Sequence, residues 1–378
     1  MIEKICNGYC CGCSACYAVC PKSAITMQEN EKGFMTPVVS EQCIECGLCM
    51  RVCNQQDKFH KVKHAYIGKL RDKALLSRSQ SGGAFTAIAE VILSKGGVVY
   101  GVALDKKLEA HHIRISSSKE LEKLKGSKYV QSRIEECLIS VYDDLKVGKL
   151  VLFSGTPCQV AGLYRFLCHT RIDIKKLYTI DLICHGTPSV LIWRSLLQYY
   201  QEKYHEKIHS VQFRDKQAGG GWGSHVSSLH FNNRIVIDNF HRGLFYSNLA
   251  LCDSCYECKY TQTNRIGDIT ISDAWGVKEK DPDFYDEGGV SLILENTEKA
   301  SKLIKVLSKE MFTREVIFES YLQEPLHKPS KPHRNKEEFW NDYHIKSFSY
   351  IISKYAKKNI FLNWKYILKK VRDKLHVR

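Results

Sequence analysis

The spacing of apolar positions in the first part of the chain's body predicts alternating helices and strands. After the loop Ser81-Gly82-Gly83, apolar side chains recur at helical spacing over 84–92, and a strand is predicted over 98–103. A second helix is predicted to begin at Ser132, which forms a capping box with Glu135 three residues later. The order of these elements favours an α/β arrangement.

Two strand-turn-helix units follow, and they resemble each other. An apolar strand over 150–153 leads into Gly155-Thr156-Pro157-Cys158, and a strand over 178–183 leads into Cys184-His185-Gly186-Thr187-Pro188. In each unit the Thr is the predicted N-cap and the Pro the first helical residue. Cys158 and Cys184 are therefore expected near the carboxyl ends of two buried strands, at the edge of a parallel sheet where ligands collect.

The second half of the chain turns towards antiparallel structure. Residues 226–231 and 234–238 alternate around Asn232-Asn233, which predicts a hairpin, and a further strand is predicted over 268–272. The body is therefore predicted to be α/β, with a mixed (α+β) sheet.

Eight cysteines repeat one pattern twice near the N-terminus. Each run reads C-x2-C-x2-C-x3-C, followed by Pro21 in the first run and by Asn54 in the second. In two-cluster bacterial ferredoxins the fourth cysteine of each run serves the other cluster. We therefore assign Cys10, Cys13, Cys16 and Cys53 to one 4Fe-4S cluster, and Cys43, Cys46, Cys49 and Cys20 to the second.

The alternative for these runs is a pair of zinc sites. Zinc typically takes paired C-x2-C units that are separated by a longer loop, not an unbroken run of four cysteines. Cys6 and Cys11 do not fit the spacing of either run and are interpreted as cysteines that bind no cluster. Residues 1–57 are thus predicted to form a small dicluster ferredoxin-like domain that precedes the body.

A third group of cysteines lies in the body. Cys252, Cys255 and Cys258 are spaced C-x2-C-x2-C. Our hypothesis is a third 4Fe-4S cluster bound by Cys158, Cys184, Cys255 and Cys258, with Cys252 as a spare, because two helix N-termini would stabilise its negative charge. The alternative is that Cys158 and Cys184 are small buried hydrophobes and that 252–258 binds zinc or nothing.

Two glycine-rich loops are further candidates for cofactor contact. Ser81-Gly82-Gly83 opens a helix and could present free backbone N–H groups to a phosphate, or it could be a plain Ser N-cap. Phe213–Lys216 with Gly219–Gly223 is either a mobile loop over a planar cofactor or, as is more usual, a surface loop anchored by Trp222. His111-His112 is interpreted as surface or structural.

Composition and charge narrow the class of protein. The 378 residues are 44% apolar and 26% charged, as in soluble globular proteins, with no apolar run long enough to span a membrane. The N-terminus lacks a secretory signal, so we expect a cytoplasmic protein whose 17 cysteines point to metal rather than disulfides. No dinucleotide fingerprint, phosphate-binding loop, metalloprotease or nucleophile-elbow motif occurs, so nicotinamide binding is not supported.

The net charge of +15 is concentrated at the C-terminus. Residues 344–378 carry ten Lys or Arg and one Asp, so the first 343 residues carry only +6. From Phe361 onwards a basic amphipathic helix is predicted, which suits peripheral contact with the anionic inner membrane surface or with an acidic partner. The alternative is a terminal helix that docks on its own domain.

Several short motifs together resemble the family of coenzyme F-420 hydrogenase/dehydrogenase beta subunits over residues 1 to about 310. Besides the dicluster segment, the motifs are Gln80-Ser81-Gly82-Gly83, Gly126-Ser127-Lys128-Tyr129, Ser154-Gly155-Thr156-Pro157-Cys158-Gln159, Ile183-Cys184-His185-Gly186, Cys255-Tyr256-Glu257-Cys258 and Gly267 to Gly276. The resemblance implies an FAD-containing iron-sulfur oxidoreductase. Relatives pass electrons between a deazaflavin or ferredoxin and a partner subunit, or reduce chlorophyll and bacteriochlorophyll precursors.

The resemblance also implies site residues and a domain organisation. Its candidates for flavin contact are Ser81, Gly82, Gly83, Lys128, Tyr129 and Thr156. It divides the chain into the dicluster domain 1–57, an N-terminal α/β domain 63–148, a C-terminal α/β domain 149–310 and a helical basic tail 311–378. The departures from the family pattern are Asn54 and the extra Cys252, and no catalytic residue is assigned.

The chemistry of the two kinds of cofactor agrees with this resemblance. Clusters carry one electron at a time and organic substrates usually need two, so a flavin is the natural converter between them. We expect the N-terminal clusters to exchange electrons with an FAD that serves coenzyme F-420 or another small-molecule substrate. The redox partner is a ferredoxin, a deazaflavin or a partner subunit, and a homo-oligomer is left open.

Two other classes of function remain at this point. A non-catalytic electron-transfer subunit of a larger complex would hold clusters but show no turnover without its partner. A basic iron-sulfur nucleic-acid-binding protein would show steep salt dependence. We rank it low and expect no nucleic-acid partner, because the body is nearly neutral.

The basic tail generates the first prediction. Deletion of residues 344–378 is expected to abolish flotation of the protein with anionic liposomes, because the deleted segment holds +9 of the +15 net charge. Flotation with zwitterionic liposomes is the control. Equal binding of anionic liposomes by both forms would remove the membrane role.

Overall fold

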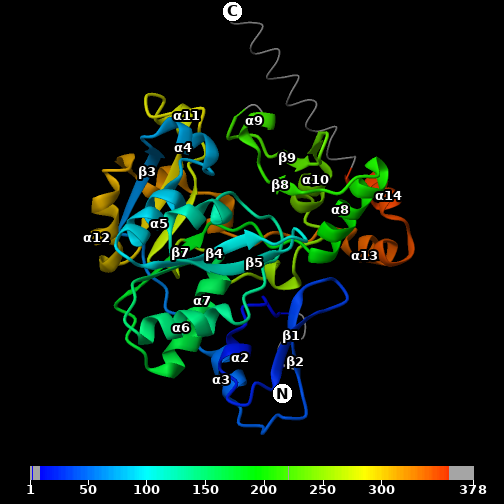
Figure 1. Cartoon of the computed structure of the whole chain (residues 1–378), viewed down its shortest axis with the longest axis horizontal. Coiled ribbons are helices and arrows are strands. Elements are labelled where there is room, and N and C mark those ends of the chain that lie inside the picture. Colours follow the sequence, from blue (N-terminus) through cyan, green and yellow to red (C-terminus); the bar gives the residue numbers. More distant parts are fainter. Residues whose placement is uncertain (1, 3–8, 220, 357–378) are drawn as a thin grey trace, which may run out of the picture.

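The computed structural model describes residue 2 and residues 9–219 and 221–356. Three parts are visible in Figure 1: an N-terminal segment in blue, a large sheet with helices on both faces, and a smaller sheet beside a group of helices. The amphipathic helix predicted from Phe361 lies outside the described residues. Residues 344–356 of the basic segment are described, and Ile351, Ile352 and Tyr355 are buried in an apolar core rather than exposed as a tail. Within the described ranges, no helix combines the length and apolar character needed to cross a bilayer.

The N-terminal segment is built from two cysteine loops, each followed by a short helix. Helix α2 (Ala15–Ala18) and helix α3 (Leu48–Asn54) flank the antiparallel pair β1 (Ile25–Glu29) and β2 (Met35–Val39). Its apolar core is small, and five of the predicted cluster cysteines pack directly against that core. The segment therefore has little apolar surface of its own to bury, and it leans on the body through α2 and α3.

The large sheet has eight strands in the order β13-β3-β12-β11-β7-β6-β4-β5. Its strands are β3 (His64–Leu70), β4 (Val98–Leu104), β5 (Ala110–Ile115), β6 (Val151–Gly155), β7 (Leu177–Leu182), β11 (Ile269–Asp273), β12 (Ser291–Glu295) and β13 (Met311–Val316). The central strands β4, β6, β7 and β11 run parallel, and the outer strands pair antiparallel. The sheet is therefore mixed, as predicted.

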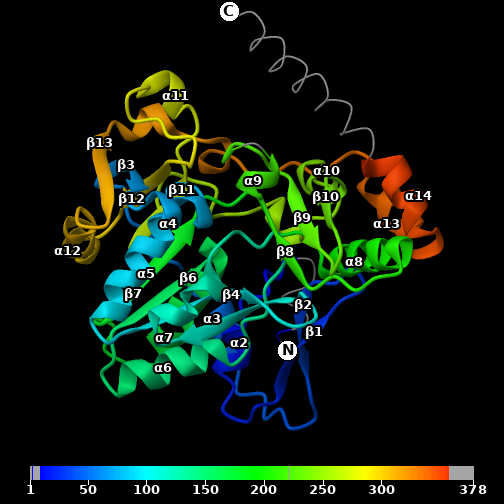
Figure 2. The ribbon, with the colours of Figure 1, turned by 45° about the horizontal axis from the view of Figure 1, so that its top comes forward.

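Helices cover both faces of this sheet. Helix α5 (Ala84–Ser94) and helix α12 (Glu298–Leu307) share one apolar core with the sheet, and α4 (Lys73–Arg78) lies beside them. Helix α6 (Cys137–Lys146) and helix α7 (Pro157–Thr170) form the core on the other face. The N-terminal segment packs against α6 and α7, beneath the sheet in Figures 1 and 2.

The smaller sheet and its helices form a separate apolar core. Strands β8 (Ser210–Gln212), β9 (Ser227–His230) and β10 (Ile235–Asp238) pair antiparallel. The helices around them are α8 (Val190–Tyr204), α10 (Phe240–Tyr246), α13 (Lys336–Ile345) and α14 (Phe348–Ile351), which continues into a π-helix over Ile352–Ala356. Short helices α9 (Lys216–Gly219) and α11 (Val277–Lys280) lie in the connecting loops.

Several local predictions are confirmed. The helix after the Ser-Gly-Gly loop is α5, the predicted hairpin is β9 with β10, and the strand predicted over 268–272 is β11. In the first Gly-Thr-Pro unit Thr156 is the N-cap of α7, with Pro157 as its first residue and the Thr156 N–H bonded to the Gln159 side chain at 2.9 Å.

Two predicted helix starts are wrong. Ser132 does not cap α6, which begins at Cys137. Its buried hydroxyl instead bonds the His112 ring at 3.2 Å and the Gln159 amide at 2.9 Å. In the second Gly-Thr-Pro unit the N-cap is Ser189, and its side chain accepts from the first turn of α8. At Ser132 tertiary hydrogen bonds outcompete a local capping signal, whereas at α8 another local cap, two residues after Thr187, takes the N-cap position.

The predicted body domains are not separate layers. Residues 63–148 supply β3, β4 and β5, and residues 149–310 supply β6, β7, β11 and β12, so both build the same eight-stranded sheet. The boundary at residue 311 also differs, because Met311–Val316 is the edge strand β13 rather than the start of a helical tail. Sheet pairing joins segments that are distant in sequence, and a linear division of the chain does not capture it.

One buried ion pair joins β7 to the loop before β11 and generates a stability prediction. Asp181, fully buried, accepts bonds from the Arg265 guanidinium at 3.2 Å and the Thr270 hydroxyl at 2.5 Å. Asp181→Asn would leave the buried Arg265 charge without its partner, so the free energy of unfolding is expected to fall by about 3–5 kcal/mol in urea titrations.

A surface ion pair provides the matched control for this prediction. Asp173 and Lys175 are 3.8 Å apart and exposed, so Asp173→Asn is expected to change the unfolding free energy by less than about 0.5 kcal/mol. Equal stability of both variants would contradict the role assigned to the buried pair.

Candidate redox site

The structure brings together the first predicted set of four cysteines. Burial raises the pKa of the Cys16 thiol, and the neighbouring thiols of Cys13, Cys10 and Cys53 raise it further. Cys53 comes from α3, at the end of the second run. The backbone N–H of Gly12, at a φ of 69°, donates to the Cys10 sulfur at 3.4 Å. Such N–H donors favour the thiolate form, which is the form that binds iron.

The second set of four cysteines also gathers. Burial raises the pKa of Cys49, with further increases from the nearby Cys43, Cys46 and Cys20 thiols. All four line a cavity of about 200 Å³, and the Ala24 N–H donates to the Cys20 sulfur at 3.3 Å. In both sets the fourth cysteine lies with the first three of the other run. That each set binds a cluster stays a prediction from the donor chemistry.

The body cysteines form a third set at the carboxyl ends of β6 and β7. The hydrogen bond from Cys252 raises the pKa of Cys255 most, and burial and the thiols of Cys252, Cys184 and Cys158 add to it. Burial raises the pKa of Cys184 to about 12, with Cys258 as the next contributor. The four cysteines named for a third cluster are thus neighbours, although they come from three separate segments.

Two hydrogen bonds orient this third set. The Thr156 hydroxyl is 3.1 Å from the Cys158 sulfur, and the Thr187 N–H donates to the Cys255 sulfur at 3.4 Å. Among the described ranges, no three His, Cys, Asp or Glu side chains are close enough to hold a single metal ion. The ligands of a 4Fe-4S cluster bind four different irons and are spaced more widely.

Two cysteines without a predicted role lie between the sets. The Cys11 thiol hydrogen-bonds both Cys13 of the first set and Cys158 of the third. The Cys252 sulfur bonds the Cys10 carbonyl at 3.4 Å, besides its bond to Cys255. The spacing of the cysteines in the sequence could not predict either contact, because both form only when the N-terminal segment docks on the body. The first and third sets are therefore adjacent.

A cavity of about 500 Å³ extends from the start of α5 to the third set. Five of the six candidate flavin residues line it: Ser81, Gly83, Lys128, Tyr129 and Thr156. Gly82 is not among the lining residues; a Cβ there would lie 2.1 Å from the Gly68 carbonyl oxygen, so this glycine allows close packing on β3. Cys184 lines the same cavity, which places a thiol of the third set in its wall.

The loop Ser81-Gly82-Gly83 lies at the edge of the cavity and leads into the N-terminus of α5. Gly83 is the N-cap at a φ of 82°, a conformation that glycine adopts without strain. The Ser291 hydroxyl accepts the N–H groups of Gly82 at 2.9 Å and Ala84 at 3.4 Å. Two of the donors expected to face a phosphate are therefore already bonded inside the protein. A phosphate cradle stays a prediction, with fewer free N–H groups than the sequence implied.

Lys128 takes an unexpected part in the cavity wall. Its ammonium group donates to the carbonyls of Lys123 at 3.3 Å, Lys125 at 2.7 Å and Gly126 at 3.2 Å. Burial lowers its pKa to about 7. Lys128 therefore closes its own loop, and near neutral pH it carries less than a full positive charge.

Charged and aromatic groups line a further part of the cavity wall, next to Ser291 and Tyr129. The buried Arg214 pairs with Asp273 at 2.6 Å and lies 5.4 Å from the ring centroid of Trp275. Trp222 stacks on Trp275, with 4.9 Å between the ring centroids. Trp222 therefore anchors the glycine-rich loop, as in the second of the two interpretations drawn from the sequence. Two buried donors that line the cavity, Gln80 Nε2 and Arg214 Nε, have no hydrogen-bond partner. Both could be satisfied by a bound polar molecule.

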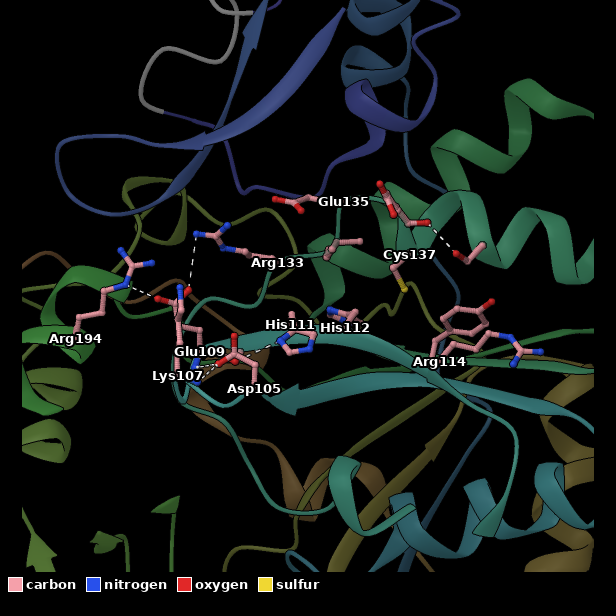
Figure 3. A pocket seen from close by; sticks show the side chains of 15 residues that line it. Asp105, Lys107, Glu109, His111, His112, Arg114, Arg133, Glu135, Cys137 and Arg194 are labelled. Carbon is pink, nitrogen blue, oxygen red and sulfur yellow. Dashed lines mark hydrogen bonds and ion pairs between the residues drawn. The ribbon is translucent and has the colours of Figure 1, made fainter. Parts of the chain in front are cut away.

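A second, larger cleft of about 850 Å³ lies beside β5. Figure 3 shows Arg133 and Arg194 turned towards Glu109 in its wall. The same two arginines also bind Glu29 of β1, at 2.8 and 2.7 Å. This cleft follows the seam between the N-terminal segment and the body, and these charges neutralise one another. His112 is buried and hydrogen-bonded to the Ser154 carbonyl at 3.2 Å, which makes it structural.

Comparison with known proteins agrees with this arrangement of thiols and cavity. Residues 148–316 match the family model for the C-terminal part of the coenzyme F420 hydrogenase/dehydrogenase beta subunit, and residues 65–138 match the model for its N-terminal part. The chain belongs to this family of beta subunits. Residues 9–56 match a 4Fe-4S dicluster domain. The resemblance seen in the sequence is confirmed, and the chain is an iron-sulfur member of a family of oxidoreductase subunits.

Two curated relatives show how far the similarity extends. The F subunit of the F(420)H(2) dehydrogenase of Methanosarcina mazei is 26% identical over 48% of this chain and 55% of its own length. The beta subunit of the F420-dependent formate dehydrogenase 1 of Methanococcus maripaludis is 28% identical over 66% of this chain and 60% of its own length. The alignments thus span little more than half of each relative.

A solved structure also shows similarity. A chain of the F420-reducing [NiFe] hydrogenase complex from Methanosarcina barkeri aligns with 69% of this chain and 85% of its own length. The TM-score is 0.49 and the sequence identity 14%. At this level the similarity supports no statement about the site.

Iron counting tests the third set of cysteines. Anaerobically purified protein is expected to hold about twelve irons per chain if all three sets bind 4Fe-4S clusters, and about eight if only the N-terminal sets do. Cys184→Ser is expected to lower the count from about twelve to about eight. The matched control is Cys168→Ser, at an exposed cysteine outside all three sets. About eight irons in the unsubstituted protein would exclude the third cluster.

Proposed function

We propose that this protein is an FAD-dependent iron-sulfur oxidoreductase that moves electrons between its N-terminal clusters and an organic substrate, coenzyme F420 or another two-electron carrier. The observation that carries the proposal is the cavity of about 500 Å³, lined both by Ser81, Lys128 and Thr156 and by Cys184. A cofactor in this cavity would contact the residues that the family resemblance assigns to flavin and a thiol of the third set.

The chemistry of the cavity suits a flavin. Its volume lies within the range of about 300–1,000 Å³ that is usual for cofactor sites. The unpartnered donors of Gln80 and Arg214 lie on its walls and would gain acceptors from a polar, ring-containing ligand. FAD would supply the conversion between two-electron and one-electron transfer. Gln80, Arg214 and the α5 N-terminus would bind and orient it.

The part of the cavity wall that carries aromatic rings is the proposed place for the organic substrate. His225 and Tyr246 line it together with Trp275, and the Tyr246 hydroxyl is 2.8 Å from His225 Nδ1. Burial lowers the pKa of His225 to about 4, and the charges of Arg214 and Arg242 lower it further. His225 is therefore neutral at physiological pH, and the aromatic rings beside it offer a surface for a planar ligand.

The placement of the thiol sets supports an electron path along the N-terminal segment. The third set borders the cavity, and the first set adjoins the third through Cys11. The second set is outermost, and its Cys46 is exposed next to Ile44, which is 58% exposed. A redox partner would therefore exchange electrons at the second set, and substrate would do so at the cavity.

A non-catalytic electron-transfer subunit is the second candidate. It is favoured by the names of the relatives, which are subunits of a dehydrogenase and a formate dehydrogenase. In that case a partner subunit would supply the substrate chemistry, and the exposed second set would be the contact with it. Anaerobic reduction with candidate donors separates the two: bleaching of flavin and cluster absorbance by a deazaflavin donor without a partner supports the enzyme.

Flavin binding provides a sharper test of the cavity. Gln80→Leu removes an unpartnered donor from the cavity wall, so the dissociation constant for FAD is expected to rise about threefold to tenfold, as for one lost hydrogen bond. Titration of the flavin-free protein followed by flavin fluorescence measures it. Gln217→Leu is the matched control, because Gln217 is exposed and outside the cavity. Failure of the unsubstituted protein to bind FAD after reconstitution would contradict the proposal.

A further inference from the structure

Helix α7 presents three functional positions on one face towards the N-terminal segment. Cys158, Gly162 and Arg165 are spaced i, i+4 and i+7, so they follow one another along the same side of the helix. Cys158 belongs to the third set. A Cβ on Gly162 would lie 2.7 Å from the Cys13 Cβ and 2.9 Å from its sulfur, so α7 touches the first set directly.

Arg165 lies one turn further along and is buried. Its Nε and Nη2 donate to the two carboxylate oxygens of Asp57, both at 2.7 Å. Nη1 donates to the Cys53 carbonyl at 3.3 Å, and Nη2 also bonds the Tyr260 hydroxyl at 2.8 Å. One guanidinium therefore joins the carbonyl of a first-set cysteine, the segment after α3 and the loop that follows Cys258.

The charges around Arg165 do not cancel. Asp57 also pairs with Lys259 at 2.7 Å, so two cations face one carboxylate and leave a net positive charge beside Cys53. Burial lowers the pKa of Arg165, but its bond to Asp57 and the charges of Tyr260, Asp57 and Cys13 raise it overall. The guanidinium is thus electrostatically coupled to Cys13 as well. With 6% of its surface exposed, Arg165 is little screened by water.

We propose that Arg165 is a positioning residue that raises the reduction potential of the cluster held by Cys10, Cys13, Cys16 and Cys53. Thiolate-bound clusters become more negative when they accept an electron, and net charge and hydrogen bonding nearby set their potential. A buried cation next to two ligands stabilises the reduced form more than the oxidised form. The inference rests on the proposed function, because it requires that the first set binds a cluster.

This placement has a consequence for the electron path. The first set lies between the third set, at the cavity, and the exposed second set. Arg165 contacts a carbonyl of the first set and the hydroxyl of Tyr260, two residues after Cys258 of the third set. It therefore favours an electron at the middle position more than the same cluster would without Arg165, and its bonds link the first set to the loop after Cys258.

The test uses the full-length, anaerobically reconstituted protein and redox titration followed by electron paramagnetic resonance. In Arg165→Gln one N-terminal cluster is expected to shift to lower potential. At the midpoint of the unsubstituted protein, its ratio of reduced to oxidised form should fall about tenfold. The other N-terminal cluster should keep its midpoint. Arg165→Lys keeps the charge and should keep the midpoint, whereas a purely structural role predicts that Lys and Gln behave alike.

Arg194 provides the matched control. It also links the N-terminal segment to the body, because it pairs with Glu29 of β1 and with Glu109 of the body, and both partners are carboxylates rather than thiols. Arg194→Gln should therefore leave both midpoints unchanged. An equal shift in Arg194→Gln, or unchanged midpoints in Arg165→Gln with full iron content, would overturn the inference.

A second variant covers the case in which Arg165→Gln loses its iron or does not fold. Lys259→Gln removes the solvent-side cation of the same group, whose side chain is 55% exposed, and should lower the same midpoint by a smaller amount. An unchanged midpoint there would then overturn the inference. If the unsubstituted protein gives no 4Fe-4S signals, the proposed function fails and the inference fails with it. If the signals are present but the variants do not shift them, only the inference about Arg165 fails.

Discussion

The close contact between α7 and the first cysteine loop is the constraint on which the arrangement of the redox site depends. Gly162 has no side chain, and the Cys13 side chain occupies the space that a Cβ would need. Because Cys158 lies one turn before Gly162 on the same helix, this single contact sets the distance between the first and third sets. A rigid helix is well suited to this task, since its residue spacing is fixed by backbone hydrogen bonds.

Electrostatics reinforces the same contact. Both seams between the N-terminal segment and the body are held by arginine-carboxylate pairs: Arg165 with Asp57, and Arg133 and Arg194 with Glu29. The segment has a small apolar core of its own, so these pairs add to the apolar contacts that Ala15 and Val52 make with the core of the body. Two buried guanidinium groups near the thiol sets each contact a carboxylate, Asp57 for Arg165 and Asp181 for Arg265. These contacts offset part of the desolvation cost of burying the arginine charges.

The cavity adds a different constraint, because its wall combines groups of different chemistry. Backbone loops, Lys128, aromatic rings and the Arg214–Asp273 pair all line it. Strands β6, β7 and β11 end at this wall, which places Thr156, Cys184 and Asp273 around one space. A parallel sheet gathers such residues because the carboxyl ends of its strands meet at one edge. The mixed outer strands extend the sheet without disturbing that edge.

Local spacing is enough to predict most strands and helices and the two cysteine runs. The Gly-Thr-Pro unit at Thr156 and the hairpin of β9 and β10 depend on residues that are close in the chain, so their patterns persist in the folded protein. The start of α6, the pairing of β13 and the position of Cys11 and Arg165 between the thiol sets depend instead on tertiary contacts. These features depend on contacts between residues that are far apart in the chain, such as Arg165 and Asp57, and no local pattern encodes such a pairing.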